Sequence, residues 1–144
     1  PQADIFTHAY DPGAVSALIR SKTVRTTSVG RLPFATRLYQ KYQPQMPRAH
    51  EENDLTGYDL VLSSESGPAK GVIAPPDAPH ICYCHSPMRY LWDQYHVYRS
   101  TAGVVSRMML PHLAHRLRAW DVTSAARVDS FVANSTHEAA RIEK

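Results

Sequence analysis

The residue types that could do chemistry are concentrated in one stretch of the chain, from His80 to Asp93. It begins as a short run of β-branched and aromatic residues, breaks at Ser86-Pro87, and continues as an expected helix rich in aromatic residues. Open α/β folds bind ligands where a strand ends and the next helix begins. His85 stands at that position, where an imidazole can donate a hydrogen bond to a sugar hydroxyl or a phosphate oxygen. The stretch therefore predicts a turn that lines a substrate cleft, although a histidine bonded only to the backbone would fit the same place.

The same stretch also suggests a metal site, through His80, Cys82, Cys84 and His85. Alternation along a strand places the first three side chains on one face. Structural zinc sites, however, usually combine two separate pairs of ligands with at least two residues between them. Cys82 and Cys84 are therefore predicted to be small core residues of a central strand, and no metal is expected.

A second group of polar residues follows an earlier strand, at Glu65, Ser66 and Lys70. A turn that opens a short helix offers free backbone N–H groups to an anion, and Lys70 adds positive charge. The spacing between Gly67 and Gly71 is not that of a Walker loop. An ordinary turn with a surface lysine is the alternative.

A third group lies on the helix expected after Pro87. Arg89 is one helical turn from Asp93, so an ion pair between them is the simple explanation. The functional alternative is a wall of the cleft formed by Arg89, Tyr90 and Trp92. No Ser-His-Asp order or paired-carboxylate motif stands out, so the sequence does not support hydrolase chemistry.

These groups must be positioned by strands that alternate with helices. Strands are predicted at residues 3–9, 23–29, 58–64, 80–84 and 129–135, and helices at 12–20 (capped by Asp11), 34–42, 87–98, 101–127 (kinked or divided at Pro111) and from 136, with a bent or loop-like segment at 43–50. Polar residues end three of the strands: Ser63-Ser64-Glu65, Cys84-His85-Ser86 and Asn134-Ser135. The pattern predicts an α/β, Rossmann-like fold with a mainly parallel sheet, helices on both faces and a cleft at the carboxyl edge.

Composition is that of a soluble globular protein of 144 residues, with 43% hydrophobic and 20% charged residues. The net charge of +3 and the pI near 9.0 permit anionic partners. Two cysteines so close together favour a reducing compartment. The basic and apolar residues between 104 and 118 suit either a helix on an anionic membrane or a solvated outer helix.

The stretch from His80 to Asp93 resembles the amino-terminal domain of glycosyltransferase family 4, the retaining transferases of the GT-B fold, and within it bacterial mannosyltransferase-like enzymes of polysaccharide and lipopolysaccharide assembly. Supporting stretches occur in family order at Ala3 to Thr7, Tyr58 to Ser64, Ala69 to Val72, Trp120-Asp121 and Val132 to Ser135. Family members carry a histidine in the loop after the Ser63-Ser64 strand, where this chain has Glu65 or Ser66.

The resemblance implies that residues 1–144 form a partial acceptor-side domain, without the first glycine-rich loop and without the carboxyl-terminal nucleotide-sugar domain. It implies transfer of a hexose, with mannose from GDP-mannose as the expected donor, to a lipid-linked or growing glycan acceptor. No cofactor, catalytic metal or nucleic acid is expected. The implied location is the cytoplasm, with peripheral contact at the inner face of the membrane.

The resemblance also assigns roles to the matching residues. His85 is the expected catalytic residue, and the substrate-binding residues are Glu65, Ser66, Lys70, Arg89 and Asn134. The chain alone is expected to be inactive or nearly so. Two other functions remain open: a stand-alone α/β module that binds an anionic ligand or a membrane surface, and a small zinc-binding domain.

Overall fold

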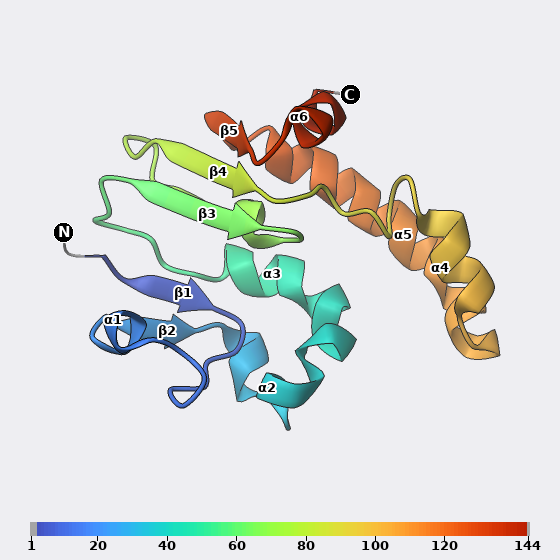
Figure 1. Cartoon of the computed structure of the whole chain (residues 1–144), viewed down its shortest axis with the longest axis horizontal. Helices are drawn as coiled ribbons and strands as arrows, with labels where there is room; N and C mark the ends of the chain where they lie inside the picture. The colour runs from blue at the N-terminus through green and yellow to red at the C-terminus, as the bar shows by residue number, and fades with distance from the viewer. Residues whose placement is uncertain (1–2, 144) are drawn as a thin grey trace. The chain divides into compact units, whose positions relative to one another are not determined.

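The computed structural model describes residues 3–143 and shows an α/β chain with two compact units. The chain passes from the first unit to the second between Asp54 and Leu55. Each unit contains its own small sheet, and all strand pairs in both sheets are parallel (Figure 1). The predicted α/β class with parallel strands is confirmed, but the strands divide between two sheets. Within residues 3–143 no helix is long and apolar enough to cross a membrane.

The first unit begins with a two-stranded sheet, β1 (Ile5–Thr7) against β2 (Val24–Thr26). The helix between them, α1 (Ala17–Arg20), is shorter than the predicted helix over 12–20. The predicted cap is wrong, because the Asp11 carboxylate accepts a hydrogen bond from Gly13 within a turn (2.9 Å). Ser16 caps α1 instead, through a bond from the Ile19 N–H.

The remainder of the first unit is a chain of short helical segments. They are η1 (Ser28–Arg31), α2 (Ala35–Leu38), η2 (Tyr39–Gln45) and α3 (Met46–Glu51). Of the bent or loop-like structure predicted over 43–50, the loop is wrong, because these residues belong to η2 and α3. Pro47 lies in the first turn of α3, where a missing N–H breaks no helical hydrogen bond. Val29, Met46 and Ala49 form the core of this unit.

The second unit is built on a three-stranded sheet in the order β3-β4-β5. The strands are β3 (Val61–Glu65), β4 (His80–Cys84) and β5 (Ser130–Ala133). Burial alternates along β3 and β4, so Glu65 and Cys84 face inward at the ends of their strands. Cys82 and Cys84 are fully buried, which confirms their prediction as core residues.

Four helical segments accompany this sheet: η3 (Ala69–Gly71), α4 (Tyr95–Thr101), α5 (Val104–Ala125) and α6 (Thr136–Ile142). The predicted division of the long helix into two is wrong, because α5 continues as one helix through Pro111. The Ser135 hydroxyl caps α6 by accepting a hydrogen bond from the Glu138 N–H (3.2 Å). The sequence predicts that either Ser135 or Thr136 caps this helix, and the structure selects Ser135.

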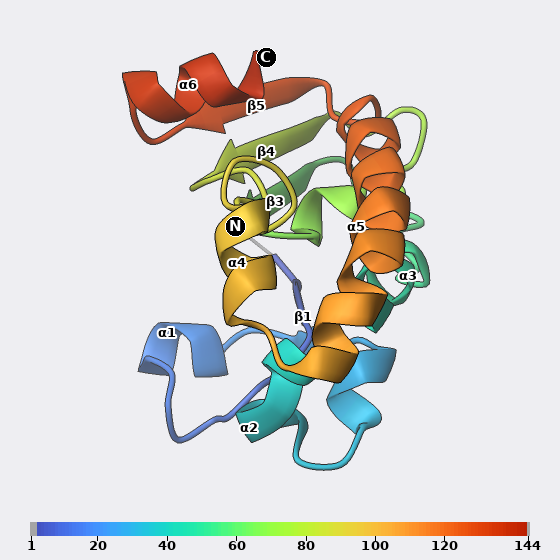
Figure 2. The same cartoon turned by 90° about the vertical axis from the view of Figure 1, so that its right-hand side faces the viewer.

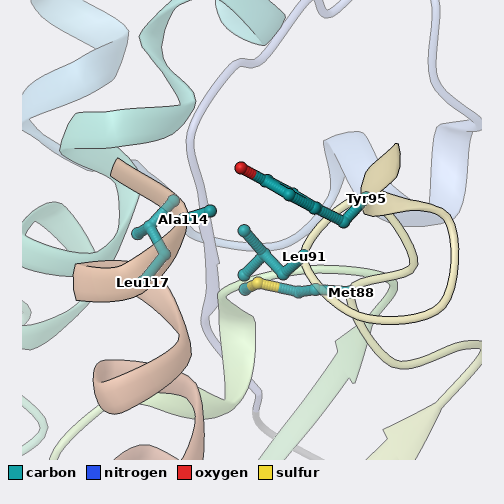
Figure 3. Packing of buried hydrophobic residues seen from close by; sticks show 5 residues of the cluster. All are labelled: Met88, Leu91, Tyr95, Ala114 and Leu117. Atoms are coloured by element: carbon teal, nitrogen blue, oxygen red, sulfur yellow. The ribbon is translucent and has the colours of Figure 1, made fainter. Parts of the chain in front are cut away.

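The predicted helix over 87–98 begins only at Tyr95, and turns occupy the preceding residues. The side chains of Met88 and Leu91 are at most 2% accessible and pack toward Ala114 and Leu117 of α5 (Figure 3). This apolar anchor fixes the turns that lead out of β4.

Helices cover the inward face of this sheet, where α5 lies (Figure 2). The opposite face exposes Leu62, Tyr83 and Val132, which are 69%, 41% and 43% accessible. A helix layer on both faces is therefore not found among residues 55–143.

Candidate functional site

His85 follows β4 directly and belongs to the outward side of the sheet. Its backbone N–H donates to the carbonyl of Glu65 (2.7 Å), and its ring Nε2 lies 2.9 Å from the hydroxyl of Ser64. The edge of the ring also contacts Tyr83, with centroids 4.9 Å apart. These bonds fix the imidazole at the ends of β3 and β4 while its side chain stays exposed.

Asn134 joins this group from the end of β5. Its side-chain amide donates to the His85 carbonyl (3.1 Å). Ser64, His85 and Asn134 thus come from the carboxyl ends of three adjacent parallel strands and lie together. We call these three residues the edge cluster.

Glu65 and Lys70 belong to a different group, on the inward side. The Lys70 ammonium lies 3.2 Å from a Glu65 carboxylate oxygen and 2.5 Å from Asp121 of α5. The second Glu65 oxygen accepts from the Lys70 backbone N–H (2.9 Å). Trp92 donates its indole N–H to the other Asp121 oxygen (2.8 Å). The sequence suggested that the Lys70 ammonium is accessible to an anionic ligand. In the structure Lys70 is buried and forms ion pairs with the carboxylates of Glu65 and Asp121.

We call Glu65, Lys70 and Asp121 the ion cluster; it contains two carboxylates and one ammonium group. Burial raises the pKa of Glu65, and the attraction of Lys70 only partly offsets that effect. Burial alone would lower the pKa of Lys70, but Glu65 and Asp121 outweigh it, so the pKa of Lys70 is raised. Lys70 therefore stays charged, and Glu65 gains a proton more readily than an exposed glutamate.

A pocket of about 940 Å³ opens beside the ion cluster. Glu65 and Cys84 contribute the ends of two strands, Phe131 contributes β5, and Trp92 and Arg118 lie on the α4–α5 side. The Arg118 guanidinium stacks on Tyr95 at 4.6 Å and on Trp92 at 5.7 Å, measured to the ring centroids. The pocket thus combines aromatic and charged side chains.

Arg141 of α6 closes another part of the pocket wall. Its guanidinium bonds Asp93 (2.9 Å), Glu138 (2.8 Å) and the hydroxyl of Ser86 (3.0 Å). The ion pair suggested between Arg89 and Asp93 is therefore wrong, because Arg141 is the partner of Asp93. Arg89 is exposed and has no ion-pair or hydrogen-bond partner for its side chain among residues 3–143.

Ser66 is the last of the residues singled out from the sequence. It is exposed in the turn between β3 and η3. The structure thus separates the six residues into the edge cluster with His85 and Asn134, the ion cluster with Glu65 and Lys70, and the two exposed positions 66 and 89.

Sequence reasoning gave no chemical role to Asp121 or Arg141. Asp121 did carry a signal, because it is the only acidic residue between Asp93 and Asp129, within a markedly basic segment. A single carboxylate in such a segment could have indicated an ion pair with a cation elsewhere in the chain, which is Lys70 in the structure. Arg141 carried no comparable signal for its bonds to Asp93 and Ser86, which lie 48 and 55 residues away in the chain.

The histidine and thiols of β4 are buried. Ser63 bonds the ring of His80 (2.9 Å). Burial raises the pKa of Cys82 to about 12 and that of Cys84 to about 11, so both thiols are unreactive near neutrality. Within the described part of the chain, no three His, Cys, Asp or Glu side chains are placed to hold one metal ion.

Comparison of the chain with protein-family models, with curated proteins and with solved structures finds no match. The geometry of the edge cluster and the ion cluster, together with the resemblance stated above, is therefore the basis for a functional proposal.

Proposed function

We propose that the chain is the acceptor-side, Rossmann-like part of a retaining family 4 glycosyltransferase. The enzyme would transfer a hexose, mannose from GDP-mannose, to a lipid-linked or growing glycan acceptor. The observation that carries the proposal is the edge cluster, in which Ser64, His85 and Asn134 meet at the carboxyl ends of three parallel strands. Parallel α/β sheets bind ligands at this edge.

In this proposal His85 faces the acceptor. Ser64 engages Nε2 and Asn134 engages the backbone carbonyl, so the ring is held in one orientation before the sugar arrives. The remaining ring nitrogen, Nδ1, has no partner among residues 3–143 and can bond a sugar hydroxyl or a phosphate oxygen. The donor phosphate would take the proton from the acceptor hydroxyl, and the protein would supply position and charge stabilisation.

The other residues divide between contact and support. Arg89 and Ser66 are exposed polar groups that can reach a substrate oxygen. Glu65 and Lys70 are buried in the ion cluster, which fixes the turn after β3. They act as positioning residues in this proposal, and any substrate contact would come from residues around them.

The test is transfer of labelled mannose from GDP-mannose to a lipid extract, using the complete polypeptide in which this chain occurs. His85→Ala should lower kcat by about 100-fold or more, as expected for loss of a positioned hydrogen-bonding group that stabilises the transition state. His96→Ala, at an exposed position on α4, is the matched control and should leave kcat unchanged.

Two results would count against the proposal. Wild-type turnover in His85→Ala would remove the role given to His85. Failure of the unmodified polypeptide to transfer any hexose from a panel of nucleotide sugars would reject glycosyl transfer itself.

A further inference from the structure

The first two turns of α5 present large apolar side chains to solvent. Val104, Val105, Met108 and Met109 are 78%, 71%, 77% and 64% accessible. We call these four residues the apolar tip. Single exposed apolar side chains are common on protein surfaces, but these four are neighbours. Contiguous exposed apolar surface is typical of sites that bind a protein or a membrane.

Helical geometry explains why the fold cannot bury the apolar tip. Each residue advances the helix by roughly 100°, so the four side chains span an arc of roughly 140°. Leu110, Ala114 and Leu117 lie on the other side of α5 and pack into the core. The apolar tip therefore faces away from the core of its own unit.

The apolar tip lies at the end of the helix pair where α4 is connected to α5. α4 and the start of α5 are joined through Gly103, at the end of α5 that is remote from β5 (Figure 1). The Arg107 guanidinium donates to the Ser100 carbonyl (2.8 Å) and ties the two helices together. The structure thus offers a formed apolar surface at the end of a helical hairpin.

The charge around the apolar tip has one sign. Between residues 94 and 120 the sequence contains four arginines and no aspartate or glutamate. Arg99, Arg107 and Arg116 are exposed there. Anionic head groups complement such a surface, whereas pairing with a second copy would place arginines opposite arginines.

We infer that the apolar tip inserts into the head-group region of an anionic phospholipid membrane, with Arg99, Arg107 and Arg116 at the level of the phosphates. The inference rests on α4 and α5 alone and is independent of glycosyl transfer.

Co-sedimentation with phosphatidylcholine vesicles, with and without phosphatidylglycerol, tests this. The chain should bind only the anionic vesicles, and added salt should weaken the binding. Met108→Ser/Met109→Ser should lower the partition constant by about tenfold or more, since each buried methionine is worth more than a tenfold step. Arg99→Gln/Arg116→Gln should lower it by about tenfold.

Matched controls come from the first unit. Leu18→Ser/Phe34→Ser changes two apolar side chains that are 72% and 71% accessible, and Arg31→Gln/Arg37→Gln changes two exposed arginines. Both should bind as the unmodified chain does. Circular dichroism checks that every variant is folded.

A local probe identifies the inserting segment. Cys82 and Cys84 are buried, so a polarity-sensitive fluorophore can be attached selectively at Val105→Cys or, for comparison, at Leu18→Cys. Anionic vesicles should shift the emission of the first label to the blue and leave the second unchanged. The inference is overturned if neutral vesicles bind equally well, if no vesicle binds, or if Met108→Ser/Met109→Ser abolishes self-association while vesicle binding is unaffected.

Discussion

Lys70 decides the electrostatics of the second unit. Among residues 3–143 it is the one cation paired with Glu65 and Asp121, and the three side chains are at most 10% accessible. Removing one partner of a buried ion pair leaves uncompensated charge, which costs far more than the pair contributes when intact.

Lys70→Met should therefore lower the free energy of unfolding of the second unit by about 3–5 kcal/mol. Urea unfolding followed by tryptophan fluorescence measures this directly, because the only tryptophans of the chain are Trp92 and Trp120. Adding Glu65→Gln and Asp121→Asn should recover part of the loss, since both uncompensated charges disappear.

Arg116→Met is the matched control for Lys70→Met. Arg116 is an exposed cation of the same unit, so its replacement should change the free energy of unfolding by no more than about 0.5 kcal/mol. Equal stability of Lys70→Met and the unmodified chain would show that the two carboxylates do not depend on the ammonium.

At the scale of elements, the contact of η3 with α5 depends on a glycine. A methyl group built at Gly71 would overlap the indole of Trp120. The carbonyl of Gly71 also accepts a hydrogen bond from Arg127 (2.9 Å), beyond the end of α5. The close approach therefore permits both an aromatic contact and a polar one.

Gly71→Ala should destabilise the second unit by about 1–3 kcal/mol, because the indole and α5 must move. Gly67→Ala is the matched control, since nothing lies within 4 Å of its added methyl group. Urea midpoints of the two variants separate the effects, and equal midpoints would contradict the proposed packing constraint.

Elements with a strong local pattern could be predicted from the sequence. β4, α5 and the Ser135 cap of α6 follow from apolar runs and a capping residue, and all three occur. α3 could not be predicted, because Pro44 and Pro47 indicate a break unless the position of Pro47 within the first turn is known. The late start of α4 depends on the burial of the preceding turns, which no local pattern encodes.

The candidate site was predictable only in part, for a similar reason. The strand endings predicted that Ser64, His85 and Asn134 would gather at one edge. Alternation along β3 also indicates that Glu65 and Ser64 lie on opposite faces of the sheet. The pairing of Lys70 with Asp121 could not be predicted, because the two residues lie 51 positions apart in the chain. A sequence shows which charges exist but not which of them a tertiary contact will neutralise.

On the scale of the whole molecule, acid should weaken the first unit more than the second. In the first unit the rings of His8 and His50 lie 4.1 Å apart, and burial lowers their pKa values from 6.5 to about 4 and about 3. The unfolded chain takes up these protons more readily, so this contribution to stability is full above pH 6.5 and is lost as the pH falls toward 4. In the second unit burial also lowers the pKa of His80, but the raised pKa of Glu65 works the other way, because the folded state takes up the Glu65 proton first. The two effects partly offset each other there.

Acidification below pH 6.5 should therefore lower the urea midpoint of the first unit more than that of the second. The ring signals of His8 and His50 in NMR spectra report on the first unit, and tryptophan fluorescence reports on the second. His50→Leu should reduce the pH dependence of the first unit. Equal shifts of both midpoints, or histidine titration near pH 6.5, would contradict the prediction.

Pro111 gives α5 an uneven resistance to local opening. Proline has no N–H, so the carbonyl of Arg107 lacks its usual helical donor, four residues further along the chain. The turns before Pro111 can then unwind without breaking the hydrogen bonds of the half that carries Leu117 and Asp121. Amide hydrogens there should therefore exchange with solvent sooner. The segment that carries the apolar tip is thus also the one that can change its shape against a soft surface without disturbing the core.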